Sequence, residues 1–416
     1  MRALDGLRIL DLTRVVSGPF CTMILGDLGA EVIKIEEPVS GDDSRAFGPP
    51  FVGGESAYYL SVNRNKKSCC IDLKSEEGRT LLEQMLPSCD VLVDNFRPGT
   101  LARLGLDDAR LLVANPRLIR CSITGFGAHG SDVHRPGYDL IIQGESGLMD
   151  ITGFPDSPPT KVGTSIADLV TGLYAVQAIL AAVLQRTRNG SGGRVDVSML
   201  DSMASLLTFN AGMYFTTGAS PVRRGNAHPT IFPYETFPTA DGWINLGVAN
   251  DKFWRTFCGV LDNCGVAGSD KPADLADVAR FATAPRRVEN QEALRAILEP
   301  ILRRRTRAEW LADFDRVGVP CGEIKTVGEV CEAARARGQV AEMVHPSAGR
   351  INAVLSPFRF ENQPFHEPIA PPRLGEQTDE ILRTIAGLSD AQCAALRARA
   401  VIGNQAGRAA AAKRDR

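Results

Sequence analysis

The sequence predicts an α/β fold with a large parallel-sheet domain and a smaller α+β domain. The apolar run LRILDLT at 7–13 is followed by a helix-like segment at 18–30 and a second strand-like run, EVIKIE, at 31–36. Such a strand–helix–strand unit places two parallel strands side by side, as in Rossmann-like sheets. The composition changes after Arg223, which indicates that a second module begins there.

The first half of the chain continues this alternation. Short apolar runs bounded by turn residues predict further strands at 90–95, 117–124 and 194–199. Longer periodic segments predict helices at 75–89, 165–188 and 199–216. After Arg223, TIFPYETF and WINLGV flank the turn TADG and predict a hairpin, followed by helices at 250–262, 289–304 and 306–317. A last helix is expected near 376–400, and we expect 404–416 to be a disordered tail.

Composition excludes several classes of protein. The 416 residues carry a net charge of −2, so nothing global indicates binding to nucleic acid. The ten cysteines form no C-x-x-C pair and the five histidines show no metal-ligand spacing, so we expect no metal site. The N-terminus lacks the pattern of a signal peptide, and the apolar run at 169–185 is too short to span a bilayer. We therefore expect a cytoplasmic protein without a membrane segment.

Two turns at strand ends are candidate ligand sites. The turn after the first strand has one glycine, Gly18, where a dinucleotide fingerprint needs three, so a plain strand–helix turn is the simpler interpretation. A basic cluster comprises NRNKK at 63–67, Lys74 and NFRPGTLAR at 95–103. Arginine and lysine at strand ends suit phosphate oxygens, although such a cluster can also be a solvated face. Its local basicity in a slightly acidic chain favours a site.

Asp168 is the third candidate, because it is the single acid at the start of the apolar helix TSIADLVTGLYA. It could cap this helix by accepting hydrogen bonds from the first backbone N–H groups. It could also act as a nucleophile, since the positive end of a helix favours a carboxylate while an apolar pocket raises its pKa. The two roles are compatible, and residue patterns alone favour the cap.

Six or more segments, in order along the chain, match one known family. They include RILDLTRVVSGPF, NRNKKSCCIDLK, VDNFRPGTLARLG, RPGYDLIIQGESGLM, GTSIADLVTGLYA and GRVDVSMLDSM. These segments resemble the class III CoA-transferases, the CaiB/BaiF family, which includes formyl-CoA, carnitine and dicarboxylate CoA-transferases. The resemblance extends to about residue 402. It implies that Asp168 attacks an acyl-CoA, forming first a mixed anhydride and then an aspartyl-CoA thioester. Coenzyme A is then a substrate, with no permanently bound cofactor.

The resemblance also implies which residues bind CoA. The matching positions are Val15, Val16, Ser17, Ile71, Lys74, Asn95, Phe96, Arg97, Arg103 and Tyr138. Two positions depart from the family: Glu37 replaces an arginine of some relatives, and RRGNAHPTI at 223–231 replaces a glycine loop, which leaves Gly225 and Asn226 as weaker candidates near the acyl group. The distal carboxylate of a dicarboxylate acceptor could pair with Arg45, Arg135 or Arg224.

The family's architecture implies a large CoA-binding domain at 1–222, a small domain at 223–320 and a return to the large domain at 321–403, in an interlocked homodimer. Succinyl-CoA is the expected donor and a short dicarboxylate the expected acceptor. An α-methylacyl-CoA racemase is an alternative, but GYD at 137–139 has tyrosine where racemases carry histidine. A catalytically silent CoA-binding protein is a second alternative.

Overall fold

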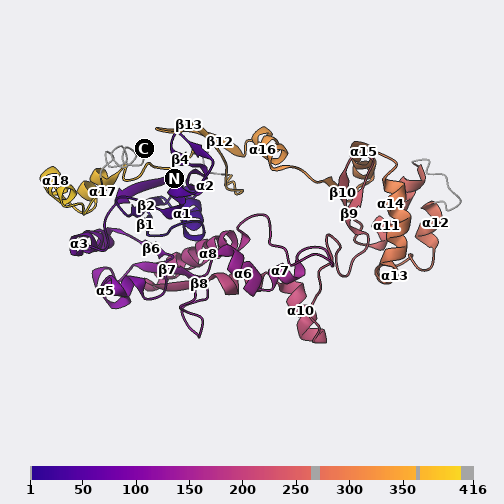
Figure 1. Cartoon of the computed structure of the whole chain (residues 1–416), viewed down its shortest axis with the longest axis horizontal. Helices are drawn as coiled ribbons and strands as arrows, with labels where there is room; N and C mark the ends of the chain where they lie inside the picture. Colours follow the sequence, from indigo (N-terminus) through magenta and orange to yellow (C-terminus); the bar gives the residue numbers. More distant parts are fainter. Residues whose placement is uncertain (1, 264–271, 362–365, 404–416) are drawn as a thin grey trace. The chain divides into compact units, whose positions relative to one another are not determined.

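The computed structural model describes residues 2–263, 272–361 and 366–403, which fall into two compact units (Figure 1). The first unit contains residues up to 148, residues 161–216 and the chain from 333 onward. The second contains 149–160 and 217–332. The ranges 1–222, 223–320 and 321–403 remain our proposal for domain limits, and the tail at 404–416 lies outside the described residues.

The first unit is built on a six-stranded parallel sheet in the order β5-β2-β1-β6-β7-β8. Its strands are β1 (Arg8–Asp11), β2 (Glu31–Glu36), β5 (Lys66–Cys70), β6 (Val91–Asp94), β7 (Ile119–Thr124) and β8 (Gly193–Ser198). The predicted α/β fold is confirmed. The strand order reverses between β1 and β6, and open α/β sheets bind ligands at the carboxyl ends of the strands beside such a switch point.

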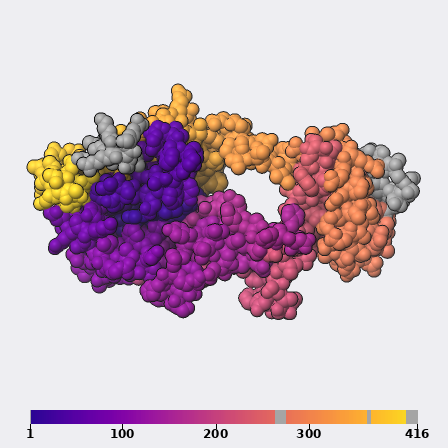
Figure 2. All heavy atoms as spheres, viewed as in Figure 1, coloured from indigo at the N-terminus to yellow at the C-terminus, as the bar shows by residue number. Residues whose placement is uncertain are grey.

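Helices cover both faces of this sheet. On one face, α1 (Ser17–Asp27) and α8 (Ile166–Asn189) pack against each other and against the strands. On the other face lie α3 (Glu76–Met85), α5 (Asp108–Ala114), α17 (Thr378–Thr384) and α18 (Asp390–Ala398). Figures 1 and 2 show the yellow C-terminal helices against the violet N-terminal part, so both ends of the chain complete one core.

The second unit has a three-stranded antiparallel sheet in the order β11-β10-β9 and a helical core of aliphatic and aromatic side chains. Its elements are β9 (Tyr234–Pro238), β10 (Trp243–Gly247), β11 (Cys321–Glu323), α11 (Asp251–Asn263), α12 (Pro272–Asp277), α13 (Ala284–Glu289), α14 (Gln291–Leu302) and α15 (Arg307–Val317). The predicted hairpin is β9 and β10, which pair in register from Tyr234 opposite Gly247 to Pro238 opposite Trp243.

Two predicted helices are broken in the structure. The segment 199–216 forms α9 (Met199–Ser205) and α10 (Thr208–Thr217), with a positive φ of 35° at Thr208. The C-terminal segment forms α17 and α18, and Gly387 between them has a φ of +73°.

The remaining elements are η1 (Asp43–Ala46), β3 (Phe51–Val52), β4 (Glu55–Ser56), α2 (Ala57–Val62), η2 (Leu86–Ser88), α4 (Thr100–Arg103), α6 (Asp139–Glu145), α7 (Leu148–Ile151), α16 (Val327–Ala336), β12 (Val340–His345) and β13 (Gly349–Val354).

Candidate active site

The switch point of the sheet brings two predicted segments together. Residues 15–17 follow β1, and Asn95 follows β6, the neighbouring strand. The Asn95 side chain joins them, because its Oδ1 accepts from the Arg14 N–H at 2.9 Å and its Nδ2 donates to the Arg14 carbonyl at 2.8 Å. The Arg14 guanidinium also lies 5.9 Å from the centre of the Phe96 ring. The two sequence-predicted segments therefore form one edge of the sheet.

The other predicted CoA contacts differ in exposure. Lys74, Arg97 and Arg103 are exposed, and Tyr138 is 70% exposed at the start of α6. Ile71 is only 1% exposed and packs into the core beneath β5. The exposed side chains are free to meet a ligand, whereas Ile71 supports the loop that carries Lys74.

Asp168 does not cap its own helix, so the cap interpretation is wrong. Helix α8 begins at Ile166 with Ser165 as its N-cap residue, which places Asp168 at the third helical position. The N–H group of Ala167, a buried residue, instead donates to Asp139 Oδ1 at 2.9 Å. Asp139 comes from α6 and supplies the capping oxygen, which leaves the Asp168 carboxylate available for other partners.

The Asp168 carboxylate turns toward the start of α1. Ser17, the first residue of α1, faces this carboxylate, and its hydroxyl and backbone N–H act as donors that lower the pKa of Asp168. The approach of the two helices depends on Gly172, one turn after Asp168. A Cβ atom at position 172 would lie 2.8 Å from the Ser17 carbonyl oxygen, so a larger residue would separate the helices.

Burial and charge shift the titration of Asp168. Burial raises its pKa, the neighbouring Asp139 carboxylate raises it further, and the hydrogen bonds from Ser17 lower it, to give a pKa of about 7. A carboxylate with this pKa is a better base and nucleophile than an ordinary aspartate, yet it is still substantially ionised near neutral pH. The pKa of Asp168 is thus raised, in contrast to the lowered pKa values of the salt-bridged acids Asp11 and Asp42.

Two residues at this site were missed by sequence reasoning. Asp139 directly follows Tyr138 in the GYD motif, which was the available signal. Burial raises the pKa of the Tyr58 phenol on α2, Ser165 lowers it, and the carboxylates of Asp168 and Asp139 raise it further. No sequence pattern connects Tyr58 with Asp168, because they are far apart along the chain.

The basic cluster at 63–67 is not a phosphate site, and it is not a solvated face. Arg64 and Lys66 are each 3% exposed. Arg64 binds both carboxylate oxygens of Asp27 at 2.9 and 2.5 Å, and Lys66 Nζ lies 3.0 Å from Asp11 Oδ2. These cations lie in and next to β5, which was not predicted as a strand, and they compensate buried acids of the same unit.

Glu37 also has an internal role. Its carboxylate accepts hydrogen bonds from the Val39 N–H at 2.9 Å and from the N–H and hydroxyl of Ser40 at 2.6 and 2.8 Å. Burial by itself raises the pKa of Glu37, but the Ser40 hydrogen bonds hold it below its ordinary value. Glu37 therefore closes the turn after β2.

The three arginines considered for the distal carboxylate differ. Arg45 is 3% exposed and binds Glu36 through two hydrogen bonds of 2.7 Å, so it is unavailable to a substrate. Arg135 is exposed and paired with Glu145. Arg224 is exposed in the second unit, where it lines a cavity of about 800 Å³ together with Asn226.

The described residues contain no group of side chains that could hold a metal ion, and they contain one long apolar helix. Within 2–263, 272–361 and 366–403, no three or more His, Cys, Asp or Glu side chains are grouped to hold a metal ion. One helix of that part of the chain, α8, is long and apolar enough to cross a bilayer by length and composition alone. Part of α8 packs into the core of the first unit through Ala175, Val176 and Ile179.

Comparisons with known proteins identify the family of the chain. The model of CoA-transferase family III matches residues 4–378. A succinyl-CoA:glutarate CoA-transferase of Mus musculus is 41% identical over 92% of this chain and 87% of its own length. An acetyl-CoA:oxalate CoA-transferase of Acetobacter aceti is 39% identical over 90% of this chain and 93% of its own length.

A solved structure has the same fold. A CaiB/BaiF family protein from Brucella suis superposes with a TM-score of 0.81 at 39% identity, covering 92% of this chain and 99% of that one. The family match spans most of the chain, and the relatives align over nearly their whole length. The chain belongs to CoA-transferase family III and is a CoA-transferase.

Proposed function

We propose that the enzyme transfers CoA from succinyl-CoA to a short dicarboxylate such as glutarate. The relatives named succinyl-CoA:glutarate CoA-transferases support this donor and acceptor. The observation that carries the mechanism is the Asp168 carboxylate, which has a pKa of about 7 and accepts hydrogen bonds from Ser17 at the switch point. Such a carboxylate is suited to nucleophilic catalysis.

Asp168 attacks the thioester carbonyl of succinyl-CoA, and the CoA thiolate leaves. The thiolate then attacks the Asp168 carbonyl carbon of the mixed anhydride, which releases succinate and forms an aspartyl-CoA thioester. The acceptor carboxylate attacks this thioester to give a second anhydride, and the thiolate attacks its acyl carbon to form the new acyl-CoA. The Ser17 N–H, at the positive end of α1, stabilises the oxyanion that develops on the Asp168 carboxyl group.

The predicted CoA contacts surround the same edge of the sheet. We propose that the turn at 15–17 and the segment 95–97 contact the CoA, with Lys74 and Arg103 available to its phosphates and Tyr138 to its pantetheine arm. Ile71 contributes indirectly, because it packs into the core and so supports the loop that carries Lys74. Arg135 and Arg224 remain the candidates for the distal carboxylate, and Gly225 and Asn226 for a role near the acyl group. No permanently bound cofactor is required by this mechanism.

We propose further that the chain works as a homodimer. None of the residues of α10 is buried, and Phe209 and Phe215 are 53% and 81% exposed. On α8, Leu173 and Leu184 are 45% and 55% exposed. Such apolar helical surface favours a protein interface. The proposal of a cytoplasmic enzyme rests on the sequence alone.

Trapping of the intermediate tests the function. The enzyme is incubated with succinyl-CoA and treated with hydroxylamine or borohydride, and the modified residue is located by mass spectrometry. We expect hydroxamate or homoserine at position 168. CoA binding without any adduct would favour the silent CoA-binding protein, and deuterium at C2 of a 2-methylacyl-CoA in deuterated water would favour the racemase. A panel of acceptor acids then defines the acceptor specificity. Exclusive use of monocarboxylates would contradict the proposal that the acceptor is a dicarboxylate.

A further inference from the structure

The turn that leads into α1 has an unusual backbone. Val15 has a φ of 69°, in the left-handed region that β-branched residues rarely adopt. Such a conformation costs about 1–3 kcal/mol and persists only where surrounding groups hold it. Ser17, which donates to Asp168, lies two residues further on.

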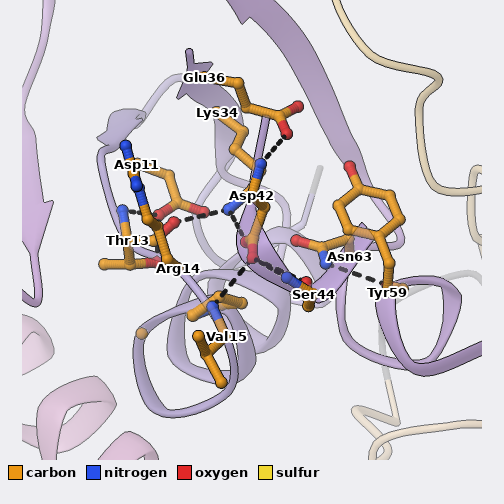
Figure 3. A network of polar contacts seen from close by, with 12 residues as sticks. Asp11, Thr13, Arg14, Val15, Lys34, Glu36, Asp42, Ser44, Tyr59 and Asn63 are labelled. Carbon is orange, nitrogen blue, oxygen red and sulfur yellow. Dashed lines mark hydrogen bonds and ion pairs between the residues drawn. The ribbon is translucent and has the colours of Figure 1, made fainter. Parts of the chain in front are cut away.

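Three side chains hold consecutive backbone groups of this turn, and Figure 3 shows two of them, Lys34 and Asp42. Lys34 Nζ donates to the Thr13 carbonyl at 2.7 Å. Asn95 binds both the N–H and the carbonyl of Arg14. Asp42 Oδ1 accepts from the Val15 N–H at 3.0 Å. Of these contacts, the Asp42 contact acts directly on the strained residue.

The Asp42 carboxylate is itself firmly held. It is 1% exposed, and its Oδ1 also accepts from the N–H and hydroxyl of Ser44 at 2.9 and 2.7 Å. Its Oδ2 lies 2.8 Å from Lys34 Nζ. Burial by itself raises the pKa of Asp42, but Lys34 and the donors from Val15 and Ser44 keep it below its ordinary value. Asparagine at position 42 has one acceptor oxygen and one NH2 group, which only donates. It could therefore satisfy either the donors of Val15 and Ser44 or the ammonium group of Lys34, but not both.

We propose that Asp42 is a positioning residue for the nucleophile: through the Val15 N–H it holds the strained turn so that Ser17 presents its two donors to Asp168. This inference rests on the proposed function of Asp168. Asp42 does not touch the reacting atoms in this role. Its effect passes through the backbone of residues 15–17 to the carboxylate that reacts.

The test is a mutant cycle of Asp42→Asn, Val15→Gly and the double variant. We expect Asp42→Asn to lower kcat and the rate of Asp168 adduct formation roughly 10–100-fold, since small displacements of reacting groups have effects of this size. Glycine adopts the left-handed region readily. The double variant should therefore lie within about threefold of Val15→Gly alone, a coupling that a purely structural role would not produce. Asp43→Asn is the matched control, because Asp43 is adjacent, equally charged and 56% exposed in its side chain.

The outcomes distinguish a failure of the proposed function from a failure of the positioning role of Asp42. If wild-type enzyme forms no adduct at Asp168, the proposed function fails. If wild-type enzyme forms it and Asp42→Asn does so equally fast, the positioning role is wrong. The role is also wrong if Asp42→Asn lowers kcat as strongly in the Val15→Gly background as in wild type. Circular dichroism and thermal melting establish folding, and a double variant that does not fold assigns Asp42 to general stability and overturns the proposal.

Discussion

Three buried acids of the first unit and the half-buried Asp168 have pKa values that are shifted in opposite directions. The three buried acids, the ionic interior, are Asp11, Glu36 and Asp42, each paired with a lysine or an arginine. Burial by itself raises the pKa of each, but the neighbouring cations hold all three below their ordinary values. Asp168, in contrast, faces the Asp139 carboxylate, and its pKa rises to about 7.

The difference shows that the neighbouring groups, rather than the depth of burial, decide whether the pKa of an acid in this protein is raised or lowered. The paired acids stay charged over the physiological range and serve to hold backbone and strands in place. Asp168 is held by neutral donors, so its charge remains available to attack a thioester. The same unit thus separates structural carboxylates from the one proposed to react.

The largest effect is expected when the reactive acid is neutralised. Asp168→Asn should lower CoA transfer between succinyl-CoA and glutarate roughly 10⁴-fold or more, because the nucleophile is lost. Asp201→Asn is a matched control, since Asp201 also lies three residues after a serine N-cap but is exposed. Undiminished transfer by a folded, CoA-binding Asp168→Asn enzyme would contradict the mechanism.

Neutralising an acid of the ionic interior should instead affect folding. Asp11→Asn leaves Lys66 without its 3.0 Å partner, and we expect a loss of about 3–5 kcal/mol in the free energy of unfolding. Urea denaturation measures it. Asp390→Asn, which breaks the exposed pair with Arg383, should barely shift the midpoint. An equal change in the free energy of unfolding for the two variants would show that the interior pairs stabilise the fold no more than an exposed pair does.

The ionic interior and Asp168 should also differ in how stability depends on pH. The folded pKa of Asp168 lies above its unfolded value of 3.8, so the folded state binds more protons and wild-type stability falls as pH rises from about 4 to 7. Asp168→Asn removes this loss and should be about 2–4 kcal/mol more stable than wild type at pH 8. The advantage should shrink as the pH falls from about 7 to 4 and should be absent below pH 4. A constant difference between variants across pH would contradict the raised pKa.

The hydrogen bonds to Asp168 require close helices. Gly172→Ala places a Cβ atom 2.8 Å from the Ser17 carbonyl oxygen and should lower kcat roughly 10–100-fold by displacing Ser17 from Asp168. Gly259→Ala in α11 is the control, because a Cβ atom there meets nothing within 4 Å. Steady-state kinetics would refute the role of the glycine if the two variants behave alike.

The smallest effect concerns the neighbouring acid. Asp139→Asn keeps an oxygen for the Ala167 N–H but removes a charge that raises the pKa of Asp168. The acid limb of kcat/KM, expected near pH 7, should move to lower pH by up to about one unit, since Asp168 then ionises more easily. Ser17 and Tyr58 still face the carboxylate in this variant. Glu145→Gln, an exposed change on the same helix, should leave the limb in place.

Local patterns were sufficient for much of the fold. The alternation of apolar strands and helices predicted β1, β2, β6, β7 and β8, because each element shows its own periodicity. β5 was missed because it begins with Lys66, which is buried, whereas lysine in a sequence normally indicates solvent. The helix break near Thr208 was missed because apolar residues continue across it, whereas the break at Gly387 was marked by that glycine and by Ser389, the N-cap residue of α18.

The chain's motifs were enough to single out Asp168, the turn at 15–17 and the family, since these depend on contiguous residues. Three-dimensional contacts were needed for the rest. The cap from Asp139, the donors from Ser17 and the clearance at Gly172 join segments that are 28 to about 150 residues apart. The chemical state of an acid depends on what packs around it, and that neighbourhood exists only once the chain has folded.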